Sequence, residues 1–364
     1  MKPLNWNLVD ILRLNSLTTV SNSNAIEIIN DYSSFDDFIR SENRLAVKAR
    51  QGSLFNDKIR ESQNGAEEQI KLCEDNNVSI ISFFDRSYPE LLREITGPPL
   101  VLFVAGRLQP EDVLSISIVG TRKVSQYGQR ATEKFASEFA KNGIIVTSGL
   151  ATGVDSFAHA YSIKNAGITY AVIASGIDKI TPSEAQQKAK KIIEKGGAVI
   201  SEYPCGTPAQ RAYFPQRNRI ISGISKATVI IESADKGGAL ITAKFAFDQE
   251  REVYAVPGNI DSDRSKGTNK LIRDNLAKIA LSAEQVLIDL GIKSEVSQDN
   301  NQHYRNLSDE EKSFLEYFSN EPVHIDELCS QMNQEMPSIL VKLLEFEFKG
   351  LVKQLPGKYY IKEM

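Results

Sequence analysis

The sequence predicts an α/β protein built around a Rossmann-like, doubly wound and mostly parallel β-sheet. Between residues 113 and 290, short apolar runs typical of buried strands alternate with segments that have helical patterns. Turns containing glycine follow the first three runs, at VGTRK, SGLATG and ASGIDK. Alternation of this kind builds βαβ units. Ligands are therefore expected at the carboxyl ends of the strands.

Six strands and four of the helices between them can be placed in chain order. The strands are expected at Ser115–Val119, Ile144–Thr147, Tyr170–Ala174, Ala198–Ser201, Ala227–Glu232 and Glu252–Val256. The helices are expected at Gln129–Lys141, Val154–Lys164, Glu184–Glu194 and Leu240–Asp248. Together they form the central domain, which is expected to span residues 76–290.

Smaller units are expected on both sides of this domain. Residues 1–75 predict an N-terminal helical (SAM-like) module of short amphipathic helices. A polar linker follows the central domain at 291–306. Residues 307–364 predict a C-terminal winged-helix domain, because three helices precede a hairpin. These helices are expected at Leu307–Phe318, Val323–Met332 and Pro337–Lys349, and the hairpin turn at Pro356 and Gly357.

The composition indicates a soluble protein of a reducing compartment. With 364 residues, 41% of them hydrophobic, the chain is long enough for two or three domains. It has no run of about 18 apolar residues and no apolar leader, so we expect a cytoplasmic protein with no membrane partner. Its three cysteines form no CxxC pair and its three histidines are scattered. Neither a metal site nor a cofactor is therefore expected.

One segment departs from the acidic character of the chain, whose formal net charge is −4. Residues 203–231 contain no acidic residue, and their cations are Arg211, Arg217, Arg219 and Lys226. Local positive charge, rather than the net sum, decides whether a groove attracts phosphate. A basic cluster by itself is more often a solvated loop. Here Tyr213 and Phe214 lie inside it, which favours single-stranded nucleic acid, because an aromatic ring can stack on a base.

The motif FPQRNRIISG is the sharpest part of this segment. Phe214 is the expected stacking residue, and Asn218 lies on the helix that follows it. Arg217 and Arg219 project from different faces of that helix, so at most one is expected to reach a ligand. The other is expected to pin a loop or to pair with a carboxylate such as Glu202 or Glu232. The sequence leaves open which arginine does which.

Three glycine turns provide the other candidate contacts with phosphate. A glycine after a strand lets backbone N–H groups approach an anion beside the positive end of the next helix. The turns contribute Gly120, Thr121, Arg122 and Lys123, then Gly153, and then Lys236, Gly237 and Gly238. Each is a weak signal, because a strand-to-helix turn often needs glycine for its shape alone. None of them matches GxGxxG or a Walker loop.

No catalytic residue is expected. His159 lies one helical turn after Asp155, so a hydrogen bond between the two is possible. No nucleophile accompanies them in the sequence. His159 is therefore expected to be structural.

In this order the motifs resemble those of the DNA-processing protein A family, known as DprA or Smf. The resemblance runs from about Tyr88 to Ile272. It rests on DRSYPELL, the PP pair, IVGTR, TSGLATGVDSFAH, SGID, GGAVISEYP, FPQRNRIISG, GGALITA, VPG and GTNKLI. So many motifs in one order make the match specific, and the two flanking units fit the family's usual layout.

The resemblance implies a protein that binds single-stranded DNA during natural transformation, protects it and loads the RecA recombinase on it. Family members are not known as enzymes, and they dimerise through the Rossmann-like domain. Carried onto this sequence, the resemblance implies a pocket formed by Gly120, Arg122, Arg211, Phe214, Arg217, Asn218 and Arg219. The chain departs from the family pattern at Thr121, Thr181 and Ala239, and at RDNLAK after GTNKLI, which leaves the shape of that corner open.

Two other functions stay open at this point. The first is a nucleotide-processing enzyme of the lysine-decarboxylase-like phosphoribohydrolase type, although DKGGALITA replaces the PGGxGT loop of those enzymes. The second is a structural partner of other competence proteins, which leaves the cation-only segment unexplained. The sequence does not locate the dimer surface or the RecA surface, and it does not tell whether the host is transformable.

The winged-helix domain is expected to contact protein rather than duplex DNA. Residues 305–364 contain seven Lys or Arg and eleven Asp or Glu, a net charge of −4. The helix that would enter a major groove is bracketed by Glu335, Glu345 and Glu347. Such a surface repels phosphate.

Overall fold

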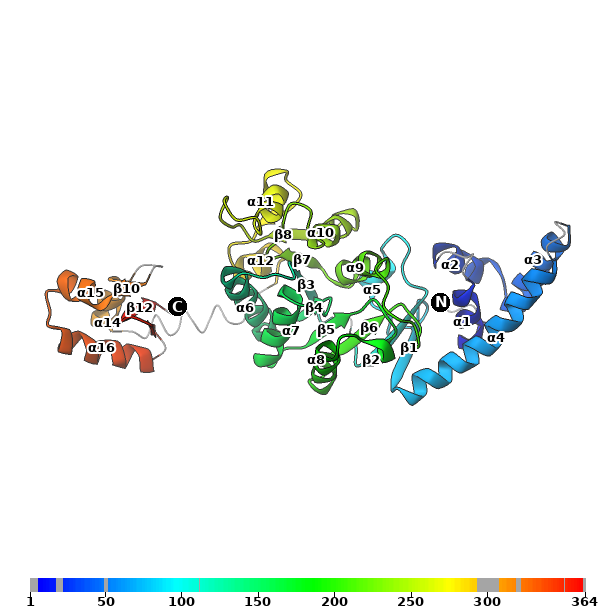
Figure 1. The fold of residues 1–364 in the computed structure, drawn as a ribbon, viewed down its shortest axis with the longest axis horizontal. Helices are drawn as coiled ribbons and strands as arrows, with labels where there is room; N and C mark the ends of the chain where they lie inside the picture. The colour runs from blue at the N-terminus through cyan, green and yellow to red at the C-terminus, as the bar shows by residue number, and fades with distance from the viewer. Residues whose placement is uncertain are drawn as a thin grey trace. The chain divides into compact units, whose positions relative to one another are not determined.

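The structure is a computed structural model and describes residues 6–17, 22–48, 52–110, 112–292, 308–318, 322–349 and 351–362. The chain divides into two units, Met1–Ile292 and Lys293–Met364, and each is described by itself (Figure 1). Most of the expected linker, residues 293–306, lies outside the described residues.

A mostly parallel sheet lies at the centre of the first unit and confirms the predicted fold class. Its strands are β1 Val78–Ser82, β2 Val101–Gly106, β3 Ser115–Val119, β4 Ile145–Ser148, β5 Thr169–Val172, β6 Ala198–Ser201, β7 Ala227–Ile230, β8 Glu252–Ala255 and β9 Lys278–Ile279. They are ordered β1-β2-β6-β5-β4-β3-β7-β8-β9. In the sheet, the neighbouring strands β6, β5, β4, β3, β7, β8 and β9 are parallel to one another. Strands β1 and β2 add an antiparallel border beside β6. The chain order reverses between β3 and β7, which makes their carboxyl ends the topological switch point.

Helices cover both faces of this sheet. One face carries α6 Gln126–Lys141, α7 Val154–Lys164, α8 Ser183–Glu194 and α12 Ala283–Asp289. The other carries α5 Glu90–Arg93, α9 Tyr213–Ile224, α10 Ala239–Asp248 and α11 Lys266–Arg273. Successive residues of a strand point to opposite faces, so Ile118 packs in the core under α6 whereas Val119 packs in the core under α9. This is the doubly wound arrangement that the sequence predicts.

The N-terminal residues form α1 Leu8–Ser16, α2 Asn22–Asp31, α3 Phe35–Lys48 and α4 Gly52–Asp75. The sequence predicts short helices here, but α4 has 24 residues, since no proline interrupts residues 52–75. Ile11 and Phe35 share one core cluster with Phe103 of β2 and Val199 of β6. Packing is therefore continuous across residue 75.

The second unit is a winged helix, as predicted. It contains α14 Asp309–Leu315, β10 Val323–His324, α15 Ile325–Met332, α16 Met336–Phe348, β11 Val352–Leu355 and β12 Tyr359–Lys362. The expected second helix begins two residues late, because Val323 and His324 pair with β12 as a third strand. Phe314, Ile339 and Leu343 lie in its core.

Candidate nucleic-acid interface

Two of the predicted glycine turns meet at the carboxyl edge of the sheet, where the carboxyl ends of the parallel strands lie together. The backbone N–H of Val154 donates to Thr121 O at 3.2 Å. Gly153 has a φ of +83°, and a β-carbon there would lie 2.3 Å from Thr121 O. A β-carbon on Gly120 would likewise lie 2.6 Å from Val154 Cγ2. Both glycines therefore permit contact between the two loops. This contact fixes the position of Thr121 and hence of Arg122, which follows it in the chain.

The ring of Phe214 lies where the loop after β3 meets the first turn of α9. The guanidinium carbon of Arg122 is 5.7 Å from the ring centroid, and that of Arg217 is 6.0 Å from it. Both distances are in the range of cation–π attraction. Arg122 is exposed and Phe214 is half-buried. The structure thus brings the expected stacking residue and the cation of the first turn into one place.

Arg217 points into the protein. Its side chain is 4% exposed, and its guanidinium donates to Gly149 O at 2.7 Å and to Val172 O. It also lies beside Asn218, whose Oδ1 accepts from Arg217 Nε at 3.2 Å. Burial lowers the pKa of Arg217 to about 10, against the opposing effect of Asp155. Arg217 therefore stays charged at neutral pH and pins the loop after β4 to the end of β5.

Arg219 is also held inside the protein. Its guanidinium pairs with Glu202, and both side chains are largely buried. Burial raises the pKa of Glu202, and the charge of Arg219 opposes that shift. The sequence leaves open which of the two arginines reaches a ligand and which pins a loop or pairs with a carboxylate; in the structure Arg217 pins a loop and Arg219 pairs with Glu202. Neither presents a free guanidinium.

Three cations around this place are exposed: Arg122 and Lys123 in the loop after β3, and Arg211 just before α9. None of the three has an ion pair with another described residue. Arg211 lies in the turn that leads into α9, three residues before Phe214. Tyr213, next to Phe214, stacks on Tyr203 with ring centroids 4.1 Å apart and planes 19° apart. No sequence pattern indicates a role for Tyr203, because the two tyrosines meet only in the fold.

The turn with Lys236, Gly237 and Gly238 has its described contacts elsewhere. Gly267 N donates to Ser233 O at 2.8 Å, and Ser233 N donates to Arg264 O at 2.7 Å. This turn is thus built against the GTNKLI corner, where α11 begins. Lys236 is exposed, but no described contact joins its turn to Phe214.

Glu232 is a residue of the site whose role the sequence analysis missed. It is 2% exposed, and its carboxylate accepts from Ser125 N at 2.9 Å and from Ser125 Oγ at 2.5 Å. Ser125 is the N-cap of α6, so Glu232 sits at the switch point, at the helix end where Rossmann-like folds commonly bind phosphate. A cavity of about 450 Å³ opens beside it, lined by Ser125, Tyr127, Glu232, Gly258, Asn259, Ser262 and Ser265.

The possible hydrogen bond between His159 and Asp155 does not form. Thr169 Oγ1 donates to Val146 O at 2.5 Å, so His159 Nδ1 must be the donor in its 2.6 Å contact with Thr169 Oγ1. Burial lowers the pKa of His159 to about 3, which keeps the ring neutral. Asp155 accepts from Ala151 N at 3.4 Å and interacts with the charge of Arg217, and burial raises its pKa. Each side chain thus has its partners elsewhere, His159 at Thr169 and Asp155 at Arg217 and the backbone of the loop after β4.

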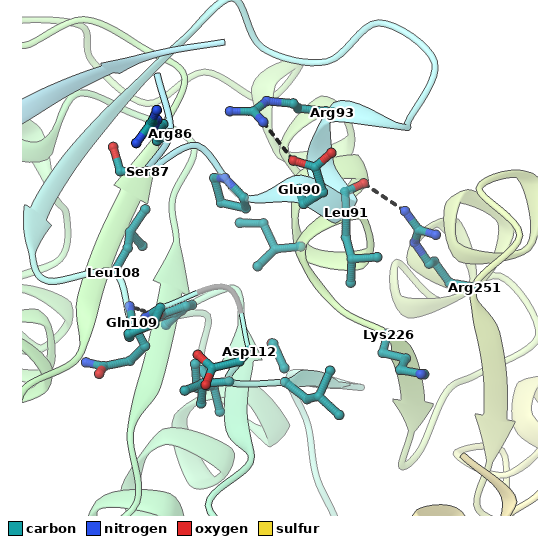
Figure 2. A pocket seen from close by; sticks show the side chains of 18 of the residues that line it. Arg86, Ser87, Glu90, Leu91, Arg93, Leu108, Gln109, Asp112, Lys226 and Arg251 are labelled. Carbon is teal, nitrogen blue, oxygen red and sulfur yellow. Dashed lines mark hydrogen bonds and ion pairs between the residues drawn. The ribbon is translucent and has the colours of Figure 1, made fainter. Parts of the chain in front are cut away.

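A larger cavity, of about 1190 Å³, opens at the opposite edge of the sheet. Its lining includes Ser115 and Ile145, at the amino ends of β3 and β4, and Lys226, just before β7. Figure 2 shows Lys226 and Arg251 on one side of this cavity and Arg86 on the other. The cations of residues 203–231, the segment without acidic residues, therefore do not form one cluster. Arg211 and Lys226 flank opposite ends of α9 and lie toward opposite edges of the sheet.

The described residues contain no helix that is long and apolar enough to span a membrane. They also bring together no group of three or more His, Cys, Asp and Glu side chains that could hold a metal ion. What the carboxyl edge offers a ligand is exposed cations, backbone N–H groups and aromatic rings.

Comparison with known proteins gives consistent matches. Residues 79–291 match the family model of DNA recombination-mediator protein A, and residues 298–358 match the DprA winged helix domain. The chain is 34% identical over 299 residues to the protein Smf of Escherichia coli (strain K12), covering 80% of each chain. Its fold is similar to the X-ray structure of DNA processing protein A (DprA) from Streptococcus pneumoniae, with a TM-score of 0.66 and 28% identity over 78% of this chain and 98% of that chain. DNA processing protein A from Helicobacter pylori, described for its single-stranded DNA binding mode, matches with a TM-score of 0.53 and 25% identity over 58% of this chain and 95% of that one.

Proposed function

The chain belongs to the family of DNA recombination-mediator protein A, and from that premise we propose that it binds single-stranded DNA. The proposed strand-binding surface consists of Arg122, Lys123, Arg211 and Phe214. The observation that carries the proposal is the Phe214 ring with the exposed Arg122 guanidinium carbon 5.7 Å from its centroid, in a chain of net charge −4. The related protein from H. pylori is described as binding single-stranded DNA, which supports the same ligand here.

The residues of this surface have separate tasks. The three cations hold phosphates, which makes the affinity dependent on salt. Phe214 stacks on a base, a contact typically worth about 1–3 kcal/mol and tolerant of sequence. Arg217 and Arg219 act from inside, since their bonds to Gly149 O and Glu202 hold the loops that frame the surface. We therefore expect binding that is nearly indifferent to base sequence.

Within the cell, we propose that the protein protects single strands during natural transformation and loads the RecA recombinase on them in the cytoplasm. Membership of the family supports this role. The test is the ATP hydrolysis of RecA on a strand already covered by single-strand-binding protein. Adding the wild-type chain should raise the rate, and adding the Phe214→Ala variant should not. Equal rates with and without the wild-type chain contradict a loading role.

We propose that the chain dimerises through the β9 edge of the sheet. Among the described strands β9 has a neighbour on one side only, and Leu276, Ile279 and Leu281 on and around it are exposed, Leu281 by 71%. An open edge with apolar side chains favours association. A dimer places two surfaces on one strand and gains affinity by avidity. Light scattering should show a dimer for the wild type and a monomer for Leu281→Glu, and an unchanged mass for the variant contradicts this edge.

The proposed function includes no bond-making step. A phosphoribohydrolase of the related type must hold a nucleotide phosphate, and the α6 N-terminus already holds the Glu232 carboxylate. A phosphate there would face a fixed negative charge. Release of free base from nucleoside monophosphates by the purified chain would overturn this part of the proposal.

The acidic winged helix is proposed to contact protein. On α16, Leu340, Val341 and Leu344 are exposed although they are apolar, which supports a protein partner more than a phosphate backbone. Removing residues 293–364 should leave affinity for a short duplex unchanged. A clear loss of duplex binding contradicts this assignment.

The decisive experiment measures fluorescence anisotropy of a labelled poly-dT strand and of a matched duplex. Phe214→Ala should weaken strand binding by roughly 5–150-fold, the equivalent of about 1–3 kcal/mol. Phe247→Ala is the matched control, because Phe247 is an exposed aromatic residue near the end of α10 and outside the proposed surface. Equal affinity for strand and duplex, unchanged by Phe214→Ala, would sink the proposal.

A further inference from the structure

Two cysteines that are far apart in sequence meet beside the segment that leads to the strand-binding surface. Cys73 lies in the last turn of α4, and Cys205 lies between β6 and α9. Their sulfur atoms are 3.8 Å apart across a separation of 132 residues. Both are free thiols, and they are 1% and 6% exposed. The third cysteine, Cys329, lies in the other unit.

Neighbouring groups hold the two thiols in place. The Gln69 side chain, one turn before Cys73, accepts from Cys205 N at 2.8 Å and donates to Cys205 O at 3.2 Å in the amide orientation that satisfies both atoms. The next residue, Gly206, donates its N–H to Asp178 Oδ1 at 2.7 Å. Backbone contacts thus fix Cys205 against α4. A disulfide has sulfur atoms about 2.05 Å apart, so side-chain rotation with a small shift of the loop is needed to close the remaining gap.

The environment also favours reaction of one thiol. The hydrogen bond with Cys205 lowers the pKa of Cys73. A lowered pKa increases the fraction of thiolate at neutral pH, and the thiolate is the form that reacts with oxidants.

We propose that Cys73 and Cys205 are a redox pair that peroxide converts to a disulfide, which fastens the segment leading into the strand-binding surface to helix α4. Hydrogen peroxide oxidises one thiol to a sulfenic acid and releases water. The second thiol then attacks that sulfur, forms the S–S bond and releases a second water. Overall, the two thiols lose two hydrogen atoms and the peroxide is reduced to two waters. A small-molecule dithiol reverses the step by exchange.

The disulfide should change the affinity of the strand-binding surface for single-stranded DNA, an expectation that rests on the function proposed above. The segment that contains Cys205 is anchored at one end by the Glu202–Arg219 pair and at the other by Tyr213, which stacks on Tyr203. Drawing Cys205 toward α4 strains these anchors, because α4 is a long packed helix and the loop must move instead. We expect oxidation to lower the affinity for single-stranded DNA by about threefold or more.

The first test treats the full chain with hydrogen peroxide and maps its peptides by mass spectrometry. The expected product is one peptide pair linked through Cys73 and Cys205, which dithiothreitol separates. Cys329→Ser should give the same product, and Cys205→Ser should give none. If Cys73 and Cys205 stay reduced, or take up oxygen separately without linking, the proposal is wrong.

The second test measures poly-dT affinity before and after oxidation, with Cys205→Ser as the control. A fall in the wild type that dithiothreitol restores, with no change in Cys205→Ser, supports the coupling. A linked pair with unchanged affinity overturns the coupling to the surface. A reduced protein that binds no strand contradicts the proposed function instead, and the peptide map still decides whether the pair exists.

Discussion

Glu232 caps the first helix after the switch point by accepting both the backbone N–H and the hydroxyl of Ser125, at 2.9 and 2.5 Å. A buried carboxylate at the positive end of a helix is stabilised by the helix dipole and by charge-assisted hydrogen bonds. The backbone O of Glu232 also accepts from Thr121 N at 2.8 Å. Glu232, a single residue in the segment that follows β7, thereby holds both ends of the loop that presents Arg122 and Lys123.

Replacing Glu232 should therefore destabilise the fold. Glu232→Ala leaves the N–H and hydroxyl of Ser125 without their acceptor in a buried place, which costs about 1–3 kcal/mol. Urea unfolding followed by circular dichroism measures the loss. Glu252→Ala is the control, since Glu252 forms an exposed pair with Lys278 and should change stability by less than about 1 kcal/mol. Equal urea midpoints for the two variants would show that the hydrogen bonds from Ser125 to Glu232 do not contribute to the stability of the fold.

The exposed cations should each contribute to the salt dependence of strand binding. For single strands the slope of log K against log salt is about −0.7 per phosphate contact. Arg122→Ala and Arg211→Ala should each make the slope shallower by about that amount. Lys226→Ala should leave the slope unchanged, because Lys226 lies at the opposite edge of the sheet. An unchanged slope in Arg122→Ala would remove that residue from the surface.

Arg217 should contribute mainly to the stability of the fold, and only indirectly to DNA binding. Arg217→Met removes the donor to the buried Gly149 O and Val172 O and the charge that opposes the burial of Asp155, and each acceptor left unpaired costs about 1–3 kcal/mol. Adding Asp155→Asn should recover part of that loss. Chemical denaturation of the single and double variants measures both effects. A fully stable Arg217→Met that fails to bind DNA would instead make Arg217 a direct contact.

His159 should make the fold sensitive to mild acid. Its pKa is about 3 in the folded protein against an ordinary value of 6.5. Above pH 6.5 the ring is neutral in both states and has no effect. Below it, the unfolded chain binds a proton that the folded chain does not, so stability falls by up to about 1.4 kcal/mol per pH unit until pH 3 is reached.

The measurement compares urea midpoints of the wild type and His159→Asn at several pH values between 7.5 and 5. The asparagine can keep the contact with Thr169 and has no proton to gain, so its midpoint should depend less on pH. Other titrating groups are common to both proteins and cancel in the difference. Parallel pH profiles would contradict a neutral buried His159.

Local pattern determined the elements of this protein. The strands Ser115–Val119 and Ala198–Ser201 and the helix Val154–Lys164 have the bounds that the sequence predicts. Apolar runs, helical periodicity and glycine turns depend on residues close together in the chain, so they can be read without the fold. The same is true of the family's motifs, which placed Phe214 and Arg122 in one site.

Only the tertiary structure decided which charges are free. Arg211, Arg217, Arg219 and Lys226 look alike in a segment without acids, yet Arg217 is buried, Arg219 is paired and Lys226 lies toward the far edge. Their partners, such as Gly149 and Glu202, come from other strand ends, and Glu232 meets Ser125 across 107 residues. The physical reason is that burial and pairing depend on which strand ends the topology brings together, and the periodicity of a single segment carries no record of that.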